Sequence, residues 1–302
     1  MDGGAGPDDY LVIFMGGGDV VLYGGADIGP ADKWAQLGTY YIGSPLGRDP
    51  IVKFGGDAIA MTVDGFFLLS NLVKAGRRGS DHSISDLVYP LLGESIKGRG
   101  VSPRSAGWQA LLYPVGNQLI FNVPRGGEDH YQLVMNMKTG AWCRYLGQNA
   151  ERWSLFDDSL YFYSGNKIFK ADTGELDDGE LIEGACYSAY NAVRGKGEKA
   201  FQHIRPHIRA RGDVNIEVVS DVDFSEDYTG DPISIVTDVG RHWDTAMWNT
   251  FPFEAISRVT REWQVLNHQG VQISVGLRSR TKTDRLEWYS TDLHFENARG
   301  EL

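Results

Sequence analysis

A unit of short apolar strands and glycine- or aspartate-rich turns recurs along the first half of the chain. Its clearest copy is residues 51–70, IVKFGGDAIAMTVDGFFLLS. Small residues there alternate with Ile59, Met61 and Val63, so one face of the strand is bulky and apolar. Asp64-Gly65 follows and predicts a β-hairpin with a type I′ turn. The chain must therefore build on short antiparallel strands.

Glycine-, aspartate- or asparagine-rich turn marks accompany these strand pairs and recur at a regular interval with one exception. They are Gly18-Asp19, the run 55–57, Gly116-Asn117 and Asp157-Asp158. Two intervals are close to ~40 residues, which is the length of a four-stranded propeller blade, and one is about twenty residues longer. Residues 1–183 are therefore predicted to form a β-propeller-like domain of about four blades.

The longer interval holds a helical insertion, residues 74–107. Apolar residues recur there at helical spacing between Ile84 and Leu92,. The pattern predicts a short helix between blades, and Pro90 is expected to interrupt it.

Longer strands begin after an acidic, turn-rich linker, residues 172–183. They are predicted at 185–189, 202–211, 215–222, 256–267, 272–277 and 285–295. Such strands with few tight turns are typical of a β-sandwich, which is predicted for residues 184–302. The fold class is thus all-β. Large aromatic residues usually fill a core or an interface, and the predicted core residues here are Trp243, Trp248, Trp263 and Trp288.

Composition narrows the class of partner. Of 302 residues, 29 are Lys or Arg and 40 are Asp or Glu, for a net charge of -11. This charge opposes tight binding to DNA phosphates but allows DNA to pass without adhering. No apolar run is long enough for a membrane span, and the N-terminus is not that of a signal peptide. Cys143 and Cys186 form no CxxC pair, so neither a disulfide framework nor a structural zinc site is expected. No cofactor is expected either.

One predicted strand carries an informative charge pattern. His203, Arg205, His207, Arg209 and Arg211 alternate with apolar residues and so share one face,. The two histidines are not expected to share a metal, because Pro206 disfavours a helix and a strand separates them by about 13 Å.

An acidic run at 220–231 offers a partner for that strand. It contains Asp221, Asp223 and Asp227, but it lacks the residue order of an EF-hand loop,. The basic strand and this run are predicted to lie on or near a subunit boundary, where opposite charges of neighbouring subunits pair. A solvated polar sheet face is an equally weighted alternative for the strand.

Several stretches together resemble a known family, the propeller-bearing tail nozzle proteins of short-tailed bacteriophages. These are also described as tail tubular or packaged-DNA stabilisation proteins. The likeness covers residues 2–23, 34–70 and 201–224, the run HWDTAMWNTF, and REWQVLNHQGVQISVGLRSR through WYSTDLHFE. GSPLGR at 43–48 and WDTAMW at 243–248 are its most specific parts, and neither is a catalytic signature.

The resemblance implies a structural virion protein, not an enzyme. It implies a homo-oligomeric ring in the tail nozzle that retains packaged DNA and conducts it during ejection. Expected partners are other phage tail and portal or adaptor proteins, with transient, non-specific passage of DNA. The protein is expected to be made in the host bacterial cytoplasm and to reside in the tail of the virion.

The resemblance also raises a question of completeness. Family members usually carry a long region before the DGGAG-like segment, which supplies further blades. Four blades are few for a closed propeller. The remaining blades are therefore expected either from a separate chain or from a longer protein of which this sequence is a fragment.

A second hypothesis belongs to a different functional class. Aromatic side chains at the mouth of a propeller can stack on sugars. The alternative is thus a propeller-type glycan-binding protein, or a glycoside hydrolase acting on host surface polysaccharide. No catalytic residues are assigned, because the sequence has no G-x-S-x-G and because the distance between paired carboxylates, not their spacing in sequence, decides such chemistry.

Overall fold

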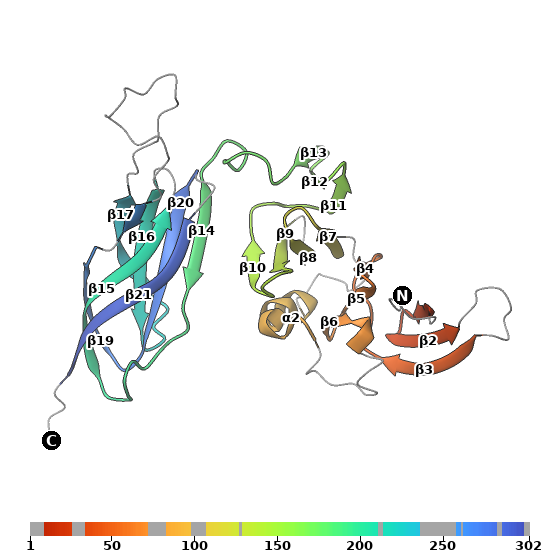
Figure 1. The fold of residues 1–302 in the computed structure, drawn as a ribbon, viewed down its shortest axis with the longest axis horizontal. Coiled ribbons are helices and arrows are strands. Elements are labelled where there is room, and N and C mark those ends of the chain that lie inside the picture. Colours follow the sequence, from red (N-terminus) through yellow and green to blue (C-terminus); the bar gives the residue numbers. More distant parts are fainter. Residues whose placement is uncertain are drawn as a thin grey trace. The chain divides into compact units, whose positions relative to one another are not determined.

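A computed structural model describes residues 9–25, 34–71, 83–97, 107–126, 129–210, 214–235, 258–260, 262–282 and 286–298. The chain divides into two compact units, Met1–Thr173 and Gly174–Leu302. Small antiparallel sheets make up most of both (Figure 1). The prediction of an all-β chain is therefore confirmed.

The division between the units falls earlier than the predicted one at 183/184. It lies within the acidic linker, at Thr173 and Gly174. Strand β14 (Ile182–Tyr187) explains the difference, because it already pairs with β20 (Ile273–Thr281) of the second unit from its first residue.

The described part of the first unit forms four sheets in chain order. Sheet 1 comprises β1 (Asp9–Phe14), β2 (Asp19–Gly25) and β3 (Ala35–Tyr41), and sheet 2 comprises β4 (Ile51–Phe54), β5 (Asp57–Thr62) and β6 (Gly65–Leu68). Sheet 3 comprises β7 (Gln109–Tyr113), β8 (Gln118–Gly126), β9 (Asp129–Asn136) and β10 (Trp142–Tyr145). Sheet 4 comprises β11 (Arg152–Phe156), β12 (Ser159–Ser164) and β13 (Lys167–Lys170). The recurring short antiparallel strands predicted for this half, including those of residues 51–70, are confirmed.

The tight turns of sheet 4 follow the sequence marks. Asp157 and Asp158 have φ values of 48° and 55°, and Gly165 and Asn166 have φ values of 52° and 66°. Positive φ at both central residues defines the type I′ turn, whose twist matches that of the flanking strands. The mark at Asp157-Asp158 is therefore a tight hairpin turn, and a second tight turn lies at Gly165-Asn166.

The hairpin between β5 and β6 is present, but its turn differs from the prediction. Its two loop residues are Val63 and Asp64, whereas Gly65, at φ 132°, already pairs with Thr62. Asp64 is not in the positive-φ region, so the turn is not type I′,. The Thr62 hydroxyl closes it instead, accepting from the Asp64 N–H at 3.2 Å and donating to the Gly65 carbonyl at 2.9 Å.

The helix of the insertion begins later than predicted. Asp86–Val88 form the 3₁₀ turn η3, and α2 runs over Tyr89–Lys97. The expected interruption at Pro90 was wrong, because Pro90 lies in the first turn, where a missing N–H breaks no helical hydrogen bond. No helix in the described ranges is long and apolar enough to cross a membrane.

Neighbouring sheets of the first unit share hydrophobic cores. Val20 of sheet 1 is buried in one cluster with Phe67 of sheet 2. Phe66, on the other face of β6, is buried with Phe121 of sheet 3 and with Leu92 of α2. The Phe66 and Phe121 rings stack with centroids 4.2 Å apart. Sheet 2 thus buries both of its faces.

Sheets 3 and 4 share a third core that contains Trp153 and a buried polar group. The Asn122 side chain of β8 is fully buried. Its Nδ2 donates to the carbonyls of Gly107 and Ala150, both at 2.7 Å. Its Oδ1 accepts from Gln132 Nε2 at 2.9 Å and from Trp153 Nε1 at 3.0 Å. All hydrogen-bonding capacity of the amide is used, so Asn122 ties β8 to β9 and to sheet 4.

The second unit contains two sheets. Sheet 5 has the order β14, β20, β16 (Val214–Val222), β17 (Thr229–Ile235). In sheet 6, β15 (Lys199–Ala210) pairs with β18 (Arg258–Thr260), β19 (Gln264–Gly270) and β21 (Leu286–Asn297). Both sheets contribute to one core, in which Ile204 and Ile208 of β15 lie with Val218 and Leu277.

Two strand predictions for this unit need correction. The strand predicted at 256–267 is divided between β18 and β19. Strand β17 was not predicted, and it begins inside the acidic run at 220–231.

The structure contains part of the predicted tryptophan core. Trp288 is half-buried against the core of the second unit, whereas Trp243 and Trp248 lie outside the described residues. Trp263 is 47% exposed and does not belong to the core. It directly precedes β19, with its ring beneath the Arg205 guanidinium. The most deeply buried tryptophan in the described ranges, Trp108 of the first unit, was not singled out from the sequence.

Replacing Asn122 by Ala should destabilise the first unit by about 3 kcal/mol, because it leaves the buried Trp153 Nε1 without its acceptor and removes one of the two acceptors of Gln132 Nε2,. Urea unfolding followed by tryptophan fluorescence measures this loss. Gln36→Ala, which removes only an exposed side-chain hydrogen bond to Thr39, is the control and should cost less than about 0.5 kcal/mol. Equal stability of the two variants would contradict the role assigned to Asn122.

Candidate assembly surface in the second unit

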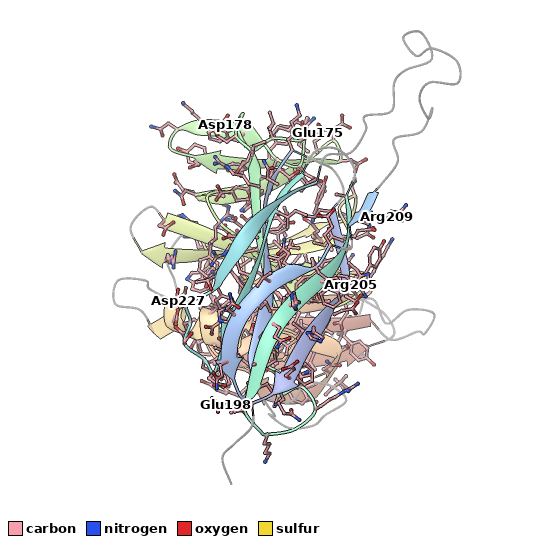
Figure 2. All side chains as sticks on the ribbon, turned by 90° about the vertical axis from the view of Figure 1, so that its left-hand side faces the viewer. Glu175, Asp178, Glu198, Arg205, Arg209 and Asp227 are labelled. Carbon is pink, nitrogen blue, oxygen red and sulfur yellow. The ribbon has the colours of Figure 1, made fainter. Side chains whose placement is uncertain are left out.

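The alternation predicted for the basic strand is present in β15. Ile204, Ile208 and Ala210 are buried, and Pro206 between them is buried as well. The intervening His203, Arg205, His207 and Arg209 are half-buried on the other face of the sheet. Figure 2 shows Arg205 and Arg209 projecting from this strand. Arg211 lies outside the described residues.

One carboxylate of β21 holds the centre of this face. Arg205 donates to Asp292 Oδ2 through Nε at 3.0 Å and Nη2 at 2.6 Å. His207 Nε2 lies 2.9 Å from the same oxygen. The guanidinium carbon of Arg205 also lies 4.5 Å from the centre of the Trp263 ring, within cation–π distance,. These hydrogen bonds, that of His207 first, hold the pKa of Asp292 below its usual range.

The far end of the basic face is also neutralised within the chain. Arg209 lies directly opposite Glu287 in the β15–β21 pairing. A hydrogen bond with Tyr289 raises the pKa of Arg209, and the Tyr289 hydroxyl donates to Glu287. The acidic neighbour that was expected on an adjacent subunit is therefore supplied by β21 of the same chain.

On the predicted acidic side of the contact, Asp221 is an internal hydrogen-bond acceptor. It is 1% exposed and accepts from the hydroxyls of Tyr190 and Ser225 and from the Glu226 N–H, the last at 3.1 Å. Burial alone would raise the pKa of Asp221, but these hydrogen bonds outweigh it and lower the pKa. The hydrogen bond to Asp221 raises the pKa of Tyr190 in turn. The Asp221 carboxylate is therefore satisfied within the chain.

Asp223 and Asp227 have different surroundings. Asp223 adopts a φ of 52° and accepts from the N–H groups of Val271 and Gln272 at 3.0 and 2.8 Å. Asp227 is exposed, and in Figure 2 it lies apart from Arg205 and Arg209. The structure thus gathers the basic residues but does not join them to the acidic run. Of the three predicted carboxylates in that run, Asp227 is the one left for an external contact.

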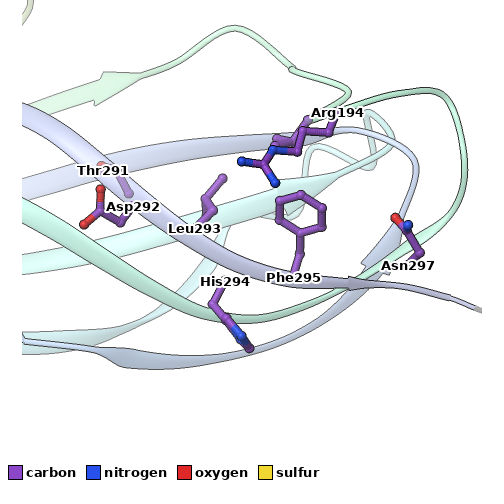
Figure 3. Close-up of a pocket in the computed structure, with 8 residues that line it drawn as sticks. Arg194, Thr291, Asp292, Leu293, His294, Phe295 and Asn297 are labelled. Carbon is purple, nitrogen blue, oxygen red and sulfur yellow. The ribbon is translucent and has the colours of Figure 1, made fainter.

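A pocket lies along β21 beside this face (Figure 3). It is lined by Val193, Arg194, Thr291, Asp292, Leu293, His294, Phe295 and Asn297. Successive residues of a strand point to opposite faces, and Figure 3 shows Phe295 and His294 projecting in opposite directions. The pocket is therefore an open depression with lining residues on both sides of β21.

The histidines of the basic face have separate partners. The His203 ring lies 5.6 Å from that of His294 and 6.4 Å from Trp263, whereas His207 bonds Asp292. Within the described ranges, no group of three or more His, Cys, Asp and Glu residues is placed to hold a metal ion.

Comparisons with known proteins assign no family. No family model matches the chain, and no curated protein matches it. A solved structure described as a glycoside hydrolase aligns with 95% of this chain and 98% of its own, at 8% identity and a TM-score of 0.19. So low a TM-score carries no argument about fold or activity.

Replacing Asp292 by Asn should lower the melting temperature at neutral pH. A carboxyl whose folded pKa is depressed stabilises the protein above its unfolded pKa, and this stability is lost as the pH falls through the folded pKa,. The difference from the wild-type protein should therefore shrink on acidification, which thermal melts across a pH series would measure. The control is Asp227→Asn, at an exposed carboxylate of the same unit. A difference that is constant at every pH would contradict the role of the Asp292 charge.

Proposed function

We propose that the chain is a structural, non-enzymatic component of a phage tail nozzle, where it forms part of a homo-oligomeric ring. The ring retains packaged DNA and conducts it during ejection. In this proposal sheets 1–4 are propeller-like blades, and sheets 5 and 6 form a β-sandwich. The partners are other tail and portal or adaptor proteins, and the location is the tail of the virion.

The observation that carries the proposal is the serial packing of small sheets in the first unit. Three successive cores join sheet 1 to sheet 2, sheet 2 to sheet 3, and sheet 3 to sheet 4. Radial repetition of small antiparallel sheets is how propellers are built. A wall of this kind resists deformation because its inner sheets, 2 and 3, are each held on both sides, which suits a component that must bear the pressure of packaged DNA.

The second unit supports a load-bearing role as well. Its two sheets bury one continuous core. Polar side chains on its outer faces pair with one another within the chain. Asp292 joins Arg205 to His207 across two strands, and Glu217 contacts Arg278 at 3.4 Å between β16 and β20. Because these side chains pair with one another across neighbouring strands, they are not arranged around a substrate.

Charge supports passage of DNA without retention by contacts. The net charge of the chain is -11. The most basic row predicted from the sequence is neutralised by β21 in the described structure. A surface with this balance repels phosphates and lets DNA slide, since tight non-specific binding requires lysine and arginine side chains free to replace counterions.

Electron microscopy of the purified chain, combined with its mass in solution, tests the proposal. Closed rings of uniform size are expected, together with weak binding to double-stranded DNA at physiological salt. A chain that stays monomeric at high concentration and binds sugars on a glycan array would overturn the proposal in favour of a glycan-binding protein or glycoside hydrolase.

A further inference from the structure

The sheets of the first unit differ in how many of their faces are covered. Sheets 2 and 3 each contribute to two hydrophobic cores, one on either side. Sheets 1 and 4 each contribute to one core. The two end sheets of the series therefore each present an outer face that no core described in the chain covers.

The outer face of sheet 1 is apolar. Leu11 and Ile13 of β1 are 50% and 41% exposed, and their cross-strand partners on β2 are Tyr23 and Val21. Residues between them in sequence, such as Val12, point to the opposite face and pack in the core shared with sheet 2. Val21 is buried on this face, whereas Leu11 and Ile13 are exposed beyond what the fold of the sheet requires.

The outer face of sheet 4 also carries exposed apolar side chains, together with the polar Arg152 and Lys170. Phe156 is 72% exposed and Ile168 is 76% exposed. Ile168 lies directly opposite Tyr163 in the pairing of β12 with β13. The inner face of the same sheet carries Trp153 and Phe162, which belong to the core shared with sheet 3.

Such end faces are unusual for an array of packed repeats. Terminal repeats normally carry a polar outer face, because that face meets water. Contiguous exposed apolar side chains mark interaction sites. The two end faces carry the same residue types as the contacts between neighbouring sheets. This indicates that each end face makes a further contact of the same kind.

The charged residues of the two end faces are of opposite sign. Asp19 shares the outer face of sheet 1 with Val21, and residues 9–25 and 34–42 contain no lysine or arginine. The outer face of sheet 4 carries Arg152, which is paired with Asp49, and Lys170, whose Nζ lies 5.9 Å from the Tyr161 ring. The two faces are therefore complementary to each other and not each to itself.

We propose that the outer face of sheet 1 in one copy of the chain packs against the outer face of sheet 4 in a second copy. A contact between two different surfaces of one chain is heterologous, and it generates a ring when the rotation between copies closes. The occupant is a second copy because one chain supplies both halves, apolar and oppositely charged. This inference deepens the proposed function by naming the surfaces of its ring, and it rests on that function for ring closure.

Cross-linking between single-cysteine variants tests the contact. Cys143 and Cys186 are exposed, so both are first replaced by serine. One preparation then carries Ile13→Cys and another Ile168→Cys, and a short bismaleimide is added. Cross-linked dimers are expected when the preparations are mixed and not from either alone, because the contact joins unlike faces. Dimers from the single preparations only, or from none, would overturn the proposal.

Ile168→Glu provides a second measurement, since a side chain that is 76% exposed can be replaced without disturbing the fold. It should weaken self-association at least about tenfold, because it places a charge in an apolar contact. Leu87→Glu, at an exposed position of η3, is the matched control and should leave association unchanged. Lys170→Glu should weaken association more at low salt than at high salt. Equal association of Ile168→Glu and the control would contradict the contact.

The outcomes separate this inference from the proposed function. Rings that form normally with Ile168→Glu, and without cross-linking of 13 to 168, would refute the contact and leave the nozzle role standing. Open filaments that cross-link between 13 and 168 would support the contact and overturn the ring.

Discussion

A sheet of three or four short strands has an apolar face, and it gains most of its stability by burying that face against another element. This constraint governs the first unit. Sheet 2 buries Phe67 on one side and Phe66 on the other, and through these two faces it joins sheets 1 and 3. Every core depends on the next sheet being in place. The Asn122 amide, whose hydrogen bonds are all made, also fixes the orientation of this packing. Its Oδ1 accepts the hydrogen bond from the Trp153 indole N–H of sheet 4 in one orientation only,.

In the second unit, apolar burial and charge pairing occupy opposite faces of one strand. Ile204 and Ile208 of β15 face the core, whereas Arg205 faces Asp292 across the ladder with β21. A row of like charges on a strand would repel itself, and cross-strand pairing with opposite charges removes that cost. The same pairing explains why the basic row need not recruit an external acid.

The sequence predicted local structure well and long-range partners poorly, for physical reasons. Alternation and turn residues are local signals, so the strands of sheets 1 to 4 and the turn at Gly165 follow from them. The partner of Arg205 is Asp292, 87 residues away, and only the strand order brings the two together. Asp221 was interpreted as surface charge because acidic runs usually are, yet the Tyr190 and Ser225 hydroxyls satisfy it inside the chain. The exposure of Trp263 likewise depends on tertiary packing that no local pattern encodes.

Folding and assembly use the same kind of contact in the proposed ring. Within the chain, each sheet covers its neighbour; at the ends of the series, the face that contains Ile13 and the face that contains Ile168 are left for another copy. The net charge of -11 repels copies at long range and so disfavours random collisions,. In the proposed contact, an approach that brings Lys170 of one copy toward Asp19 of another reverses the sign locally. Exposed apolar faces can then be kept on an acidic chain, because the attraction favours an orientation that extends the array.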